Sequence, residues 1–338
     1  MPAAGERAYV YAKACGIIGK SFTGKRIPRL RAVTRLSELE RLIFPAPGRE
    51  LPGRELLKDL ETRITGRAVK QILAIVDSFS RPPELLIRLL RAYEYSDLKT
   101  CLNLAGSGER EAPAFTGIGR FRTLRAEAFP DIDAMIRDTE FAFLLEKAPV
   151  LRGGDTISAQ TALDRHYYAG LWESLGRIPA HDRRAAEKIL GEEISLRNCA
   201  WALRLRTYYG MEAGEGREHL LDIPLKSGVS AAADAEAALE LPLDSRSAWK
   251  GWSRESFLNG ENPGGPWKAD PRFFQNRVSN YLYRLALRLF RRRPFSLDTA
   301  FCFIKLKQFE EDLLISVAEG LGMGMPGGDI FAVLEVEP

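Results

Sequence analysis

The chain has 338 residues, of which 45% are hydrophobic and 28% are charged, so it is long enough to bury a large core. Its formal net charge of +4 comes from 49 basic and 45 acidic residues, a balance too close to neutral to indicate nucleic acid or anionic lipid as a partner. No uncharged run approaches the roughly 18 residues that a membrane span requires, and the first residues lack the basic-then-apolar order of a signal peptide. We therefore expect a cytoplasmic protein with no membrane span of its own.

The four cysteines lie far apart in the sequence and mostly among apolar neighbours. They are Cys15, Cys101, Cys199 and Cys302. They lack the close pairing of a zinc site, and we expect reduced thiols in the core.

Residues 1–60 contain a tyrosine- and alanine-rich run, a basic stretch and a short amphipathic segment with a serine cap. Within them, the turn-rich segment 45–53 is predicted to be a linker. Apolar side chains then recur every three or four positions, which predicts a long helix. Pro82 and Pro83 end this helix and begin a second one, which stops near Gly106.

The clearest helix covers residues 189–211, because its apolar side chains fall on two opposite sides. One side carries Leu196, Cys199, Ala200 and Leu203, and the other carries Ile194, Trp201, Leu205 and Tyr208. We predict a helix that is packed from both sides inside a bundle, with Gly210 as its C-terminal stop.

A helix, a proline turn and a second helix occur three times along the chain. The second helices align at Asp97, Asn198 and Asp312, and they end at Gly106, Gly210 and Gly320. We predict three related helical modules, at 1–110, 111–215 and 216–338. The alternative is a chance alignment, since any amphipathic helix pairs match in part.

Strand signals are scarce along the whole chain, so we predict an all-α fold. Residues 212–272 are rich in Gly, Pro and Ala, with an alanine-rich helix expected within 220–252 and a loop at 260–267. The uncharged run 320–328 contains too many glycines for a stable helix, so we predict a tail that leads into a short extended end.

Residues 14–21, ACGIIGKS, fit a permissive form of the phosphate-binding loop, in which Lys20 and Ser21 would collect phosphate and Mg²⁺. Asp77 ends an apolar run that resembles the strand completing such a metal site. However, a working loop follows a buried strand, whereas the preceding YVYAKA contains a lysine and two alanines. A helix and loop with a surface lysine is the simpler interpretation.

Three histidines are scattered through the chain, at His166, His181 and His219. Asp164 and Glu173 lie near His166, but one histidine without a second at helical spacing is more often structural than a metal ligand. No serine lies in a nucleophile elbow and no cysteine has a neighbouring histidine. We predict no catalytic residue, no cofactor and no metal site.

Two acidic groups are candidates for acid/base catalysis. They are Glu192-Glu193 and Glu310-Glu311-Asp312. Their positions on helices, with lysines nearby, equally suit ion pairing and compensation of the helix dipole.

Basic residues gather at the end of one helix, where Arg284, Arg288 and Arg291 are spaced for a shared face. Cations are expected in the last turn of a helix, so this group does not by itself indicate nucleic acid. An acidic protein partner is the better match.

The segment LDRHYYAGLWESLGRIPAHDRRAAEKILGEEISLRNCAWALRLRTYYGM resembles the middle module of the C subunits of bacterial and archaeal V/A-type rotary ATPases, which correspond to the d subunits of the eukaryotic vacuolar enzymes. The matching residues are Glu193, Ile194, Leu196, Asn198, Trp201, Arg204 and Arg206. RRRPFSLDTAFCFIKLKQFEEDLL is similar to the third module, and AYVYAKACGIIGK to the first helix. The chain departs from the family pattern at Ser195, Cys199 and Asp312.

This resemblance implies three helical modules around a pseudo-threefold axis, forming a funnel. It also implies a non-catalytic rotor role, in which the funnel receives the central stalk and its base contacts the membrane ring that carries protons or sodium ions. Two alternatives remain, a free-standing helical scaffold for peptides and a P-loop NTPase. The sequence does not show which residues would contact the central stalk or the membrane ring.

Overall fold

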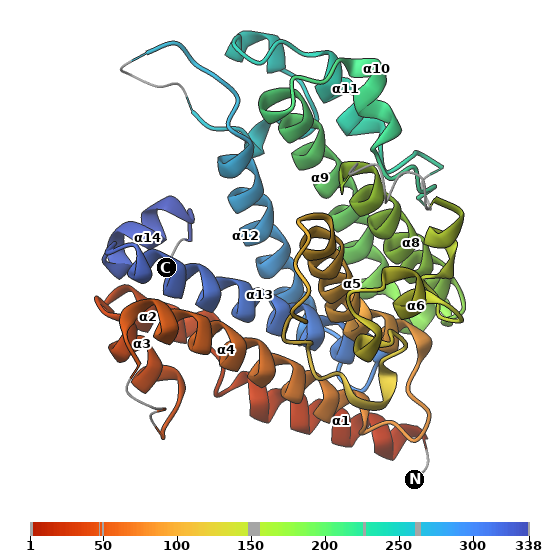
Figure 1. Cartoon of the computed structure of the whole chain (residues 1–338), viewed down its shortest axis with the longest axis vertical. Helices are drawn as coiled ribbons and strands as arrows, with labels where there is room; N and C mark the ends of the chain where they lie inside the picture. The colour runs from red at the N-terminus through yellow and green to blue at the C-terminus, as the bar shows by residue number, and fades with distance from the viewer. Residues whose placement is uncertain are drawn as a thin grey trace. The chain divides into compact units, whose positions relative to one another are not determined.

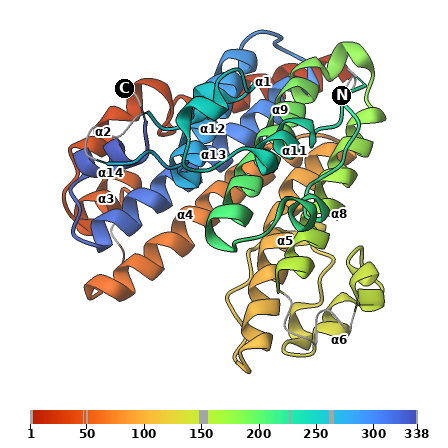
Figure 2. The ribbon, with the colours of Figure 1, turned by 90° about the horizontal axis from the view of Figure 1, so that it is seen from above.

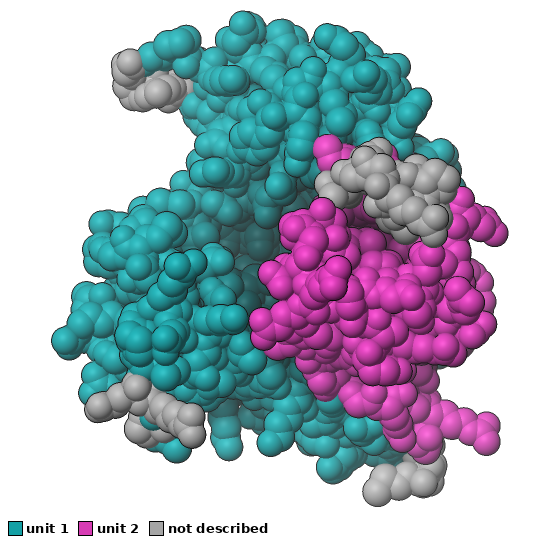
Figure 3. Space-filling model, in the orientation of Figure 1, with its two compact units in different colours: residues 1–78, 180–338 teal, residues 79–179 magenta. Residues whose placement is uncertain are grey.

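The computed structural model describes residues 3–46, 48, 51–147, 156–225, 228–260 and 265–336. Over these ranges every named element is a helix, and the β-type pairing consists of one isolated bridge, between Pro224 and Ser230. The prediction of an all-α protein is confirmed. The chain divides into two compact units, which are coloured separately in Figure 3. Unit 1 comprises residues 1–78 and 180–338, and unit 2 comprises residues 79–179.

Both units are built from helices joined by short turns and irregular loops (Figure 1). The α-helices of unit 1 are α1 (Ala3–Ile18), α2 (Pro28–Arg31), α3 (Leu36–Ile43), α4 (Gly53–Val76), α9 (Arg184–Tyr208), α10 (Ala213–Glu218), α11 (Ala233–Glu240), α12 (Pro271–Phe290), α13 (Leu297–Gly322) and α14 (Gly327–Val333). Those of unit 2 are α5 (Glu84–Gly106), α6 (Ile132–Ile136) and α8 (Thr156–Gly176). Short 3-10 turns are η1 (Gly24–Arg26), η2 (Gly119–Phe121), η3 (Ala126–Ala128), η4 (Ala142–Lys147), η5 (Ala180–Asp182), η6 (Arg246–Trp249) and η7 (Glu255–Phe257).

Helix α13 is the centre of unit 1. It packs against α1, α4, α9, α12 and α14, and Figure 2 shows α4 running beside it. Every residue from Leu297 to Ile304 is buried, which places the first two turns of α13 inside the bundle. A helix with neighbours on all sides has few low-energy ways to bend, because protein interiors are close-packed.

Helix α9 confirms the prediction of a helix packed from both sides. Leu196 and Leu203 join a core cluster with α11 and Trp249, while Ile194 is buried on the other side. Gly210, at φ +63°, adopts the left-handed conformation that ends a helix. The assignment of Tyr208 to an apolar face is wrong, since 49% of this side chain is exposed beyond the last packed turn.

In unit 2, α5 packs against α8, and two buried acids of α5 hold the loop that follows it. Glu94 accepts hydrogen bonds from the backbone nitrogens of Thr123 and Leu124. Asp97 accepts from the backbone nitrogen and the hydroxyl of Thr116, each at 2.9 Å. The Asp97 position singled out by the repeat therefore anchors a loop.

The prediction of a glycine-rich tail that leads into a short extended end is wrong. Gly320 and Gly322 still belong to α13, and Gly327 begins a further short helix. The glycines allow close packing here, because the Gly327 nitrogen donates to the Val33 carbonyl at 2.9 Å and a Cβ would lie within 2.8 Å of that oxygen. The alanine-rich helix is α11, and the predicted loops at 45–53 and 260–267 lie partly outside the described residues.

The compact units and the predicted modules divide the chain differently. Helices α4 and α5, which form the first predicted helix pair, belong to different units. Packing density and internal repetition are separate properties, so the three modules at 1–110, 111–215 and 216–338 stay a prediction.

Candidate partner-binding cavity

The structure gives the segment 14–21 a geometry unlike that of a phosphate-binding loop. Helix α1, not a strand, runs up to Ile18, and Lys20 is exposed. Ser21 is buried, donating its hydroxyl to the Ile17 carbonyl at 3.1 Å and accepting from Lys307 at 3.1 Å. Asp77, the predicted metal ligand, is the C-terminal cap of α4. The interpretation as a helix and loop with a surface lysine is confirmed.

Lys307 and Glu310 form a buried ion pair on α13. Glu310 also accepts from the Phe22 backbone nitrogen at 2.7 Å and lies 3.5 Å from Arg67. Burial lowers the pKa of Lys307, and the negative charge of Glu310 opposes that shift. Glu310 therefore ties α13 to α4 and to the segment that follows α1, which is the ion-pairing role that the sequence left open for it.

The other acidic group of the sequence analysis, Glu192-Glu193, also forms ion pairs. Glu192 lies 3.0 Å from Arg254, which in turn lies 2.7 Å from Asp234. Glu193 lies 2.7 Å from Lys305 of α13. Ion pairing is confirmed for both residues.

The residues considered around His166 have different partners. His166 Nδ1 lies 2.5 Å from the Tyr95 hydroxyl, and burial lowers the pKa of His166. Asp164 pairs with Lys99 at 2.6 Å, and Glu173 pairs with an arginine one turn later. Among the described residues no group of three His, Cys, Asp or Glu side chains could hold a metal ion.

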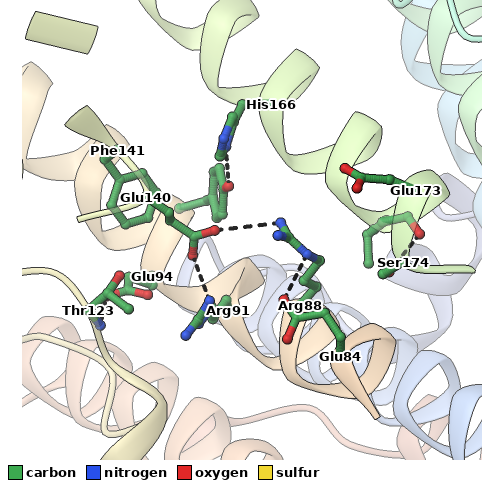
Figure 4. A network of polar contacts seen from close by, with 12 residues as sticks. Glu84, Arg88, Arg91, Glu94, Thr123, Glu140, Phe141, His166, Glu173 and Ser174 are labelled. Carbon is green, nitrogen blue, oxygen red and sulfur yellow. Dashed lines mark hydrogen bonds and ion pairs between the residues drawn. The ribbon is translucent and has the colours of Figure 1, made fainter. Parts of the chain in front are cut away.

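The same part of unit 2 contains an arginine network that links its helix α5 to the loop before η4. Arg88 lies 2.9 Å from Glu84 and 3.5 Å from Glu140, and Arg91 lies 3.2 Å from Glu140 (Figure 4). Each cation is thus matched by an acid of unit 2. The network is a structural clamp, because its members neutralise one another at hydrogen-bonding or near-hydrogen-bonding distance.

The remaining singled-out residues lie apart from one another. The basic residues Arg284, Arg288 and Arg291 are exposed on and just beyond α12, and His181 and His219 are on other segments of unit 1. Cys101, Cys199 and Cys302 are buried as predicted, and Cys15 is half-buried. Burial raises the pKa of Cys101 to about 11, so this thiol is protonated at neutral pH.

A polar cavity of about 350 Å³ lies in unit 1 between α12, α13 and the segment after α14. Its polar lining consists of Gln275, Asn276, Ser279, Asn280, Asp312 and Ser316. Asn276 and Asn280 form one wall by donating side-chain hydrogen bonds to the backbone carbonyls of residues 333–335. Figure 3 shows the surface of unit 1 hollowed where α12 lies in Figure 1.

Asp312 lines both this cavity and a smaller one beside it, together with Ser279 and Phe309. The smaller cavity measures about 120 Å³ and adds Glu193 and Lys305 to the lining. Asp312 is open to water, yet protein surrounds it closely enough that desolvation, followed by repulsion from Glu311, raises its pKa to about 7. No hydrogen bond or ion pair to its carboxylate occurs within the described part of the chain.

The sequence analysis named Asp312 as a member of an acidic group, as a position of the helix repeat and as a departure from the family pattern. It gave no sign that Asp312 would face a cavity while Glu310, two residues earlier, would be buried in an ion pair. The residues that complete the cavity come from α12 and from the C-terminal segment, which periodicity alone could not bring together.

Comparison with known sequences identifies the family. A family model described as the ATP synthase (C/AC39) subunit matches residues 49–331. The chain belongs to this family. C/AC39 proteins are accessory subunits of V/A-type ATPases, so the chain is part of a rotary ATPase complex, as residues 163–211 predicted.

A similar protein occurs in Treponema pallidum (strain Nichols), where it is described as an uncharacterized protein. The two chains are 28% identical over 324 residues, which is 94% of this chain and 92% of the Treponema protein. None of the helices that the structure describes for this C/AC39 protein is both long and apolar enough to cross a bilayer.

Proposed function

We propose that this C/AC39 protein is a non-catalytic rotor component that couples the central stalk of the ATPase to its membrane ring. In this role it is a socket on the cytoplasmic face of the membrane, and it turns with the ring during proton or sodium transport. The observation that carries the proposal is the family match over residues 49–331. The proposal includes the three related modules around a pseudo-threefold axis that the resemblance implies.

A part that transmits torque needs helices that do not shift against one another, and the packing of α9 and α13 supplies this property. Asp298, in the first turn of α13, accepts from the backbone nitrogens of Ala185 and Ala186 at the start of α9, each at 3.0 Å. Asp182, just before α9, accepts from the Leu297 nitrogen at the start of α13, at 2.8 Å. Each helix start therefore receives a carboxylate from beside the start of the other, and the two carboxylates together accept from three backbone N–H groups that have no partner within their own helix.

Arg7 extends this connection to α1, because it pairs with Asp182 at 2.5 Å. Three long helices of unit 1 thus meet at one polar joint, which complements the apolar packing around α13. Rigid coupling of this kind favours a mechanical role, since polar joints with fixed geometry specify one arrangement of the helices.

The proposal is tested by affinity purification of the tagged chain from membranes of its own organism, with mass spectrometry of the co-purified proteins. We expect the stalk and ring proteins of the rotary ATPase. As a matched control, the same chain with Leu203→Asp should lose both, because an unpaired charge would be buried among the α9 and α11 side chains. Recovery of unrelated proteins alone would overturn the socket role and support a free-standing scaffold.

A further inference from the structure

Asp312 is an acid that the protein leaves without a counter-ion at the wall of a cavity. Two acids near Asp312 have cations of their own. Glu310 of α13 pairs with Lys307, and Glu193 of α9 pairs with Lys305. Burial raises the pKa of Asp312 and the charge of Lys305 opposes that shift, but Lys305 is paired with Glu193 at 2.7 Å. A carboxylate in this position is available to a cation from outside the chain.

The lining around Asp312 offers hydrogen-bond acceptors more than donors. Asn276 and Asn280 use their amide nitrogens to hold the backbone of residues 333–335, so their side-chain oxygens remain as acceptors. The hydroxyl oxygens of Ser279 and Ser316 can also accept hydrogen bonds. No arginine or lysine is among the described residues that line the larger cavity. The chemistry of this wall therefore favours a ligand that is positive and rich in N–H groups.

The ligand is better explained as an organic cation than as a metal ion. A metal site needs several converging ligands, and no group of three acidic, histidine or cysteine side chains is present within the described ranges. The cavity, at about 350 Å³, is large enough for a long side chain, and Phe309, Leu334 and Val336 add apolar surface. Lysine and arginine combine an apolar stem with a cationic end, which matches both parts of this lining.

We propose that the cavity receives a lysine or arginine side chain from the central stalk and that this side chain pairs with Asp312. The proposal rests on the rotor function proposed above, and it names the contact by which this chain holds the stalk. An ion pair at one wall of the cavity would fix the rotational position of the stalk relative to α12 and α13, because a bound side chain cannot slide without leaving its acid.

The test is a direct binding measurement between the purified full chain and the purified central-stalk proteins of the same ATPase. Asp312→Asn keeps the shape of the side chain and removes its charge, while Glu319→Gln removes an exposed charge of the same helix outside the cavity. We expect Asp312→Asn to weaken binding by about 10- to 100-fold and Glu319→Gln to change it by less than about twofold.

The outcomes separate the two proposals. If the unmodified chain fails to bind the stalk proteins, the rotor function and the contact both fail. If it binds and Asp312→Asn binds equally well, the contact is overturned while the rotor function stands. Equal weakening by Asp312→Asn and Glu319→Gln would also overturn it, because a general loss of negative charge would then explain the effect.

The pH dependence of binding is a second readout that an altered structure alone would not reproduce. The titratable and charged groups around Asp312 are Glu311 and Lys305 of α13, Glu193 of α9 and Tyr283 of α12. A cation binds the ionised acid, and the pKa of Asp312 is raised to about 7, so affinity should fall as the pH is lowered from about 8 to about 6. The difference between the unmodified chain and Asp312→Asn should shrink over the same range. A constant difference would contradict the assignment.

Discussion

At the scale of single residues, buried acids of this protein connect segments that are distant in sequence. Glu40 of α3 is an example, since its Oε1 accepts from Arg63 Nη1 at 2.6 Å and from the Gly48 nitrogen at 2.7 Å. The hydrogen bond from Arg63 lowers the pKa of Glu40. Arg63 also lies over the Phe44 ring, so one cation serves a polar and an apolar neighbour.

The lowered pKa of Glu40 gives a prediction with a definite sign. Its stabilising effect is complete above the unfolded pKa of about 4.3 and is lost as the pH falls through the lower folded pKa. Glu40→Gln should therefore lower the free energy of unfolding by about 2 kcal/mol near neutral pH and by a smaller amount at a pH of about 3. Urea denaturation at both values measures this, and an equal loss at the two pH values would show that packing, not charge, explains the effect.

Asp312 gives the opposite prediction, because its pKa is raised to about 7 in the folded chain. An acid with a raised folded pKa costs stability once the unfolded chain ionises, and this cost reaches its full size above the folded pKa. Asp312→Asn should therefore raise the free energy of unfolding by about 1 kcal/mol at a pH of about 8, a value that allows for solvent screening at this open site. The same substitution should leave the free energy of unfolding unchanged near a pH of about 3.

Thermal or urea unfolding of the isolated chain measures this effect without any partner. A loss of stability at the higher pH would show that Asp312 has a stabilising contact within the chain, which would contradict its assignment to a partner. A gain would mean that the protein carries an acid that its own fold does not need.

At the scale of elements, the docking of α14 depends on one glycine. A Cβ added to Gly327 would lie 2.6 Å from the Leu30 carbonyl oxygen and 2.8 Å from those of Arg31 and Val33, whereas a Cβ on Gly328 would meet nothing within 4 Å. These carbonyls are backbone atoms of α2 and of the turn after it, so they cannot move aside as a side chain would.

We therefore expect Gly327→Ala to lower the free energy of unfolding by about 1 to 3 kcal/mol and Gly328→Ala to leave it within about 0.5 kcal/mol. Hydrogen exchange should show faster exchange of the Gly327 amide and of α14 in the first variant only. Equal behaviour of the two variants would mean that α14 is not held against α2 as described.

At the scale of the whole molecule, the fold gives the segment 14–21 a helical setting in place of the strand that precedes a phosphate-binding loop. Lys20 follows a helix, is exposed, and has beside it a serine whose hydroxyl is already engaged inside unit 1. Lys20→Ala should therefore leave both the assembly of the ATPase and its ATP hydrolysis within about twofold of the unmodified complex. A large loss of activity with intact assembly would bring the P-loop interpretation back.

The sequence by itself determined the helical fold and much of its internal layout. Apolar periodicity placed α4, α5 and α9 to within a few residues, because burial on one or two faces of a helix leaves a repeating mark in the sequence. Pro82 and Pro83 marked a helix boundary and Gly210 marked a helix end through local backbone preferences. The family resemblance came from the segments that form α1, α8, α9 and α13.

Only the tertiary structure decided what the acidic residues do. Glu310 and Asp312 lie two positions apart on α13, yet one is buried against Lys307 while the other faces a cavity completed by α12 and residues 334–336. The tertiary structure also decided the conformation of the last described residues. Local propensity predicted a tail with a short extended end, whereas these residues form α14, which packs through Gly327 against α2 and the turn after it. In both cases the deciding partners are distant in sequence, and their effect on charge and packing depends on distances that only the folded chain fixes.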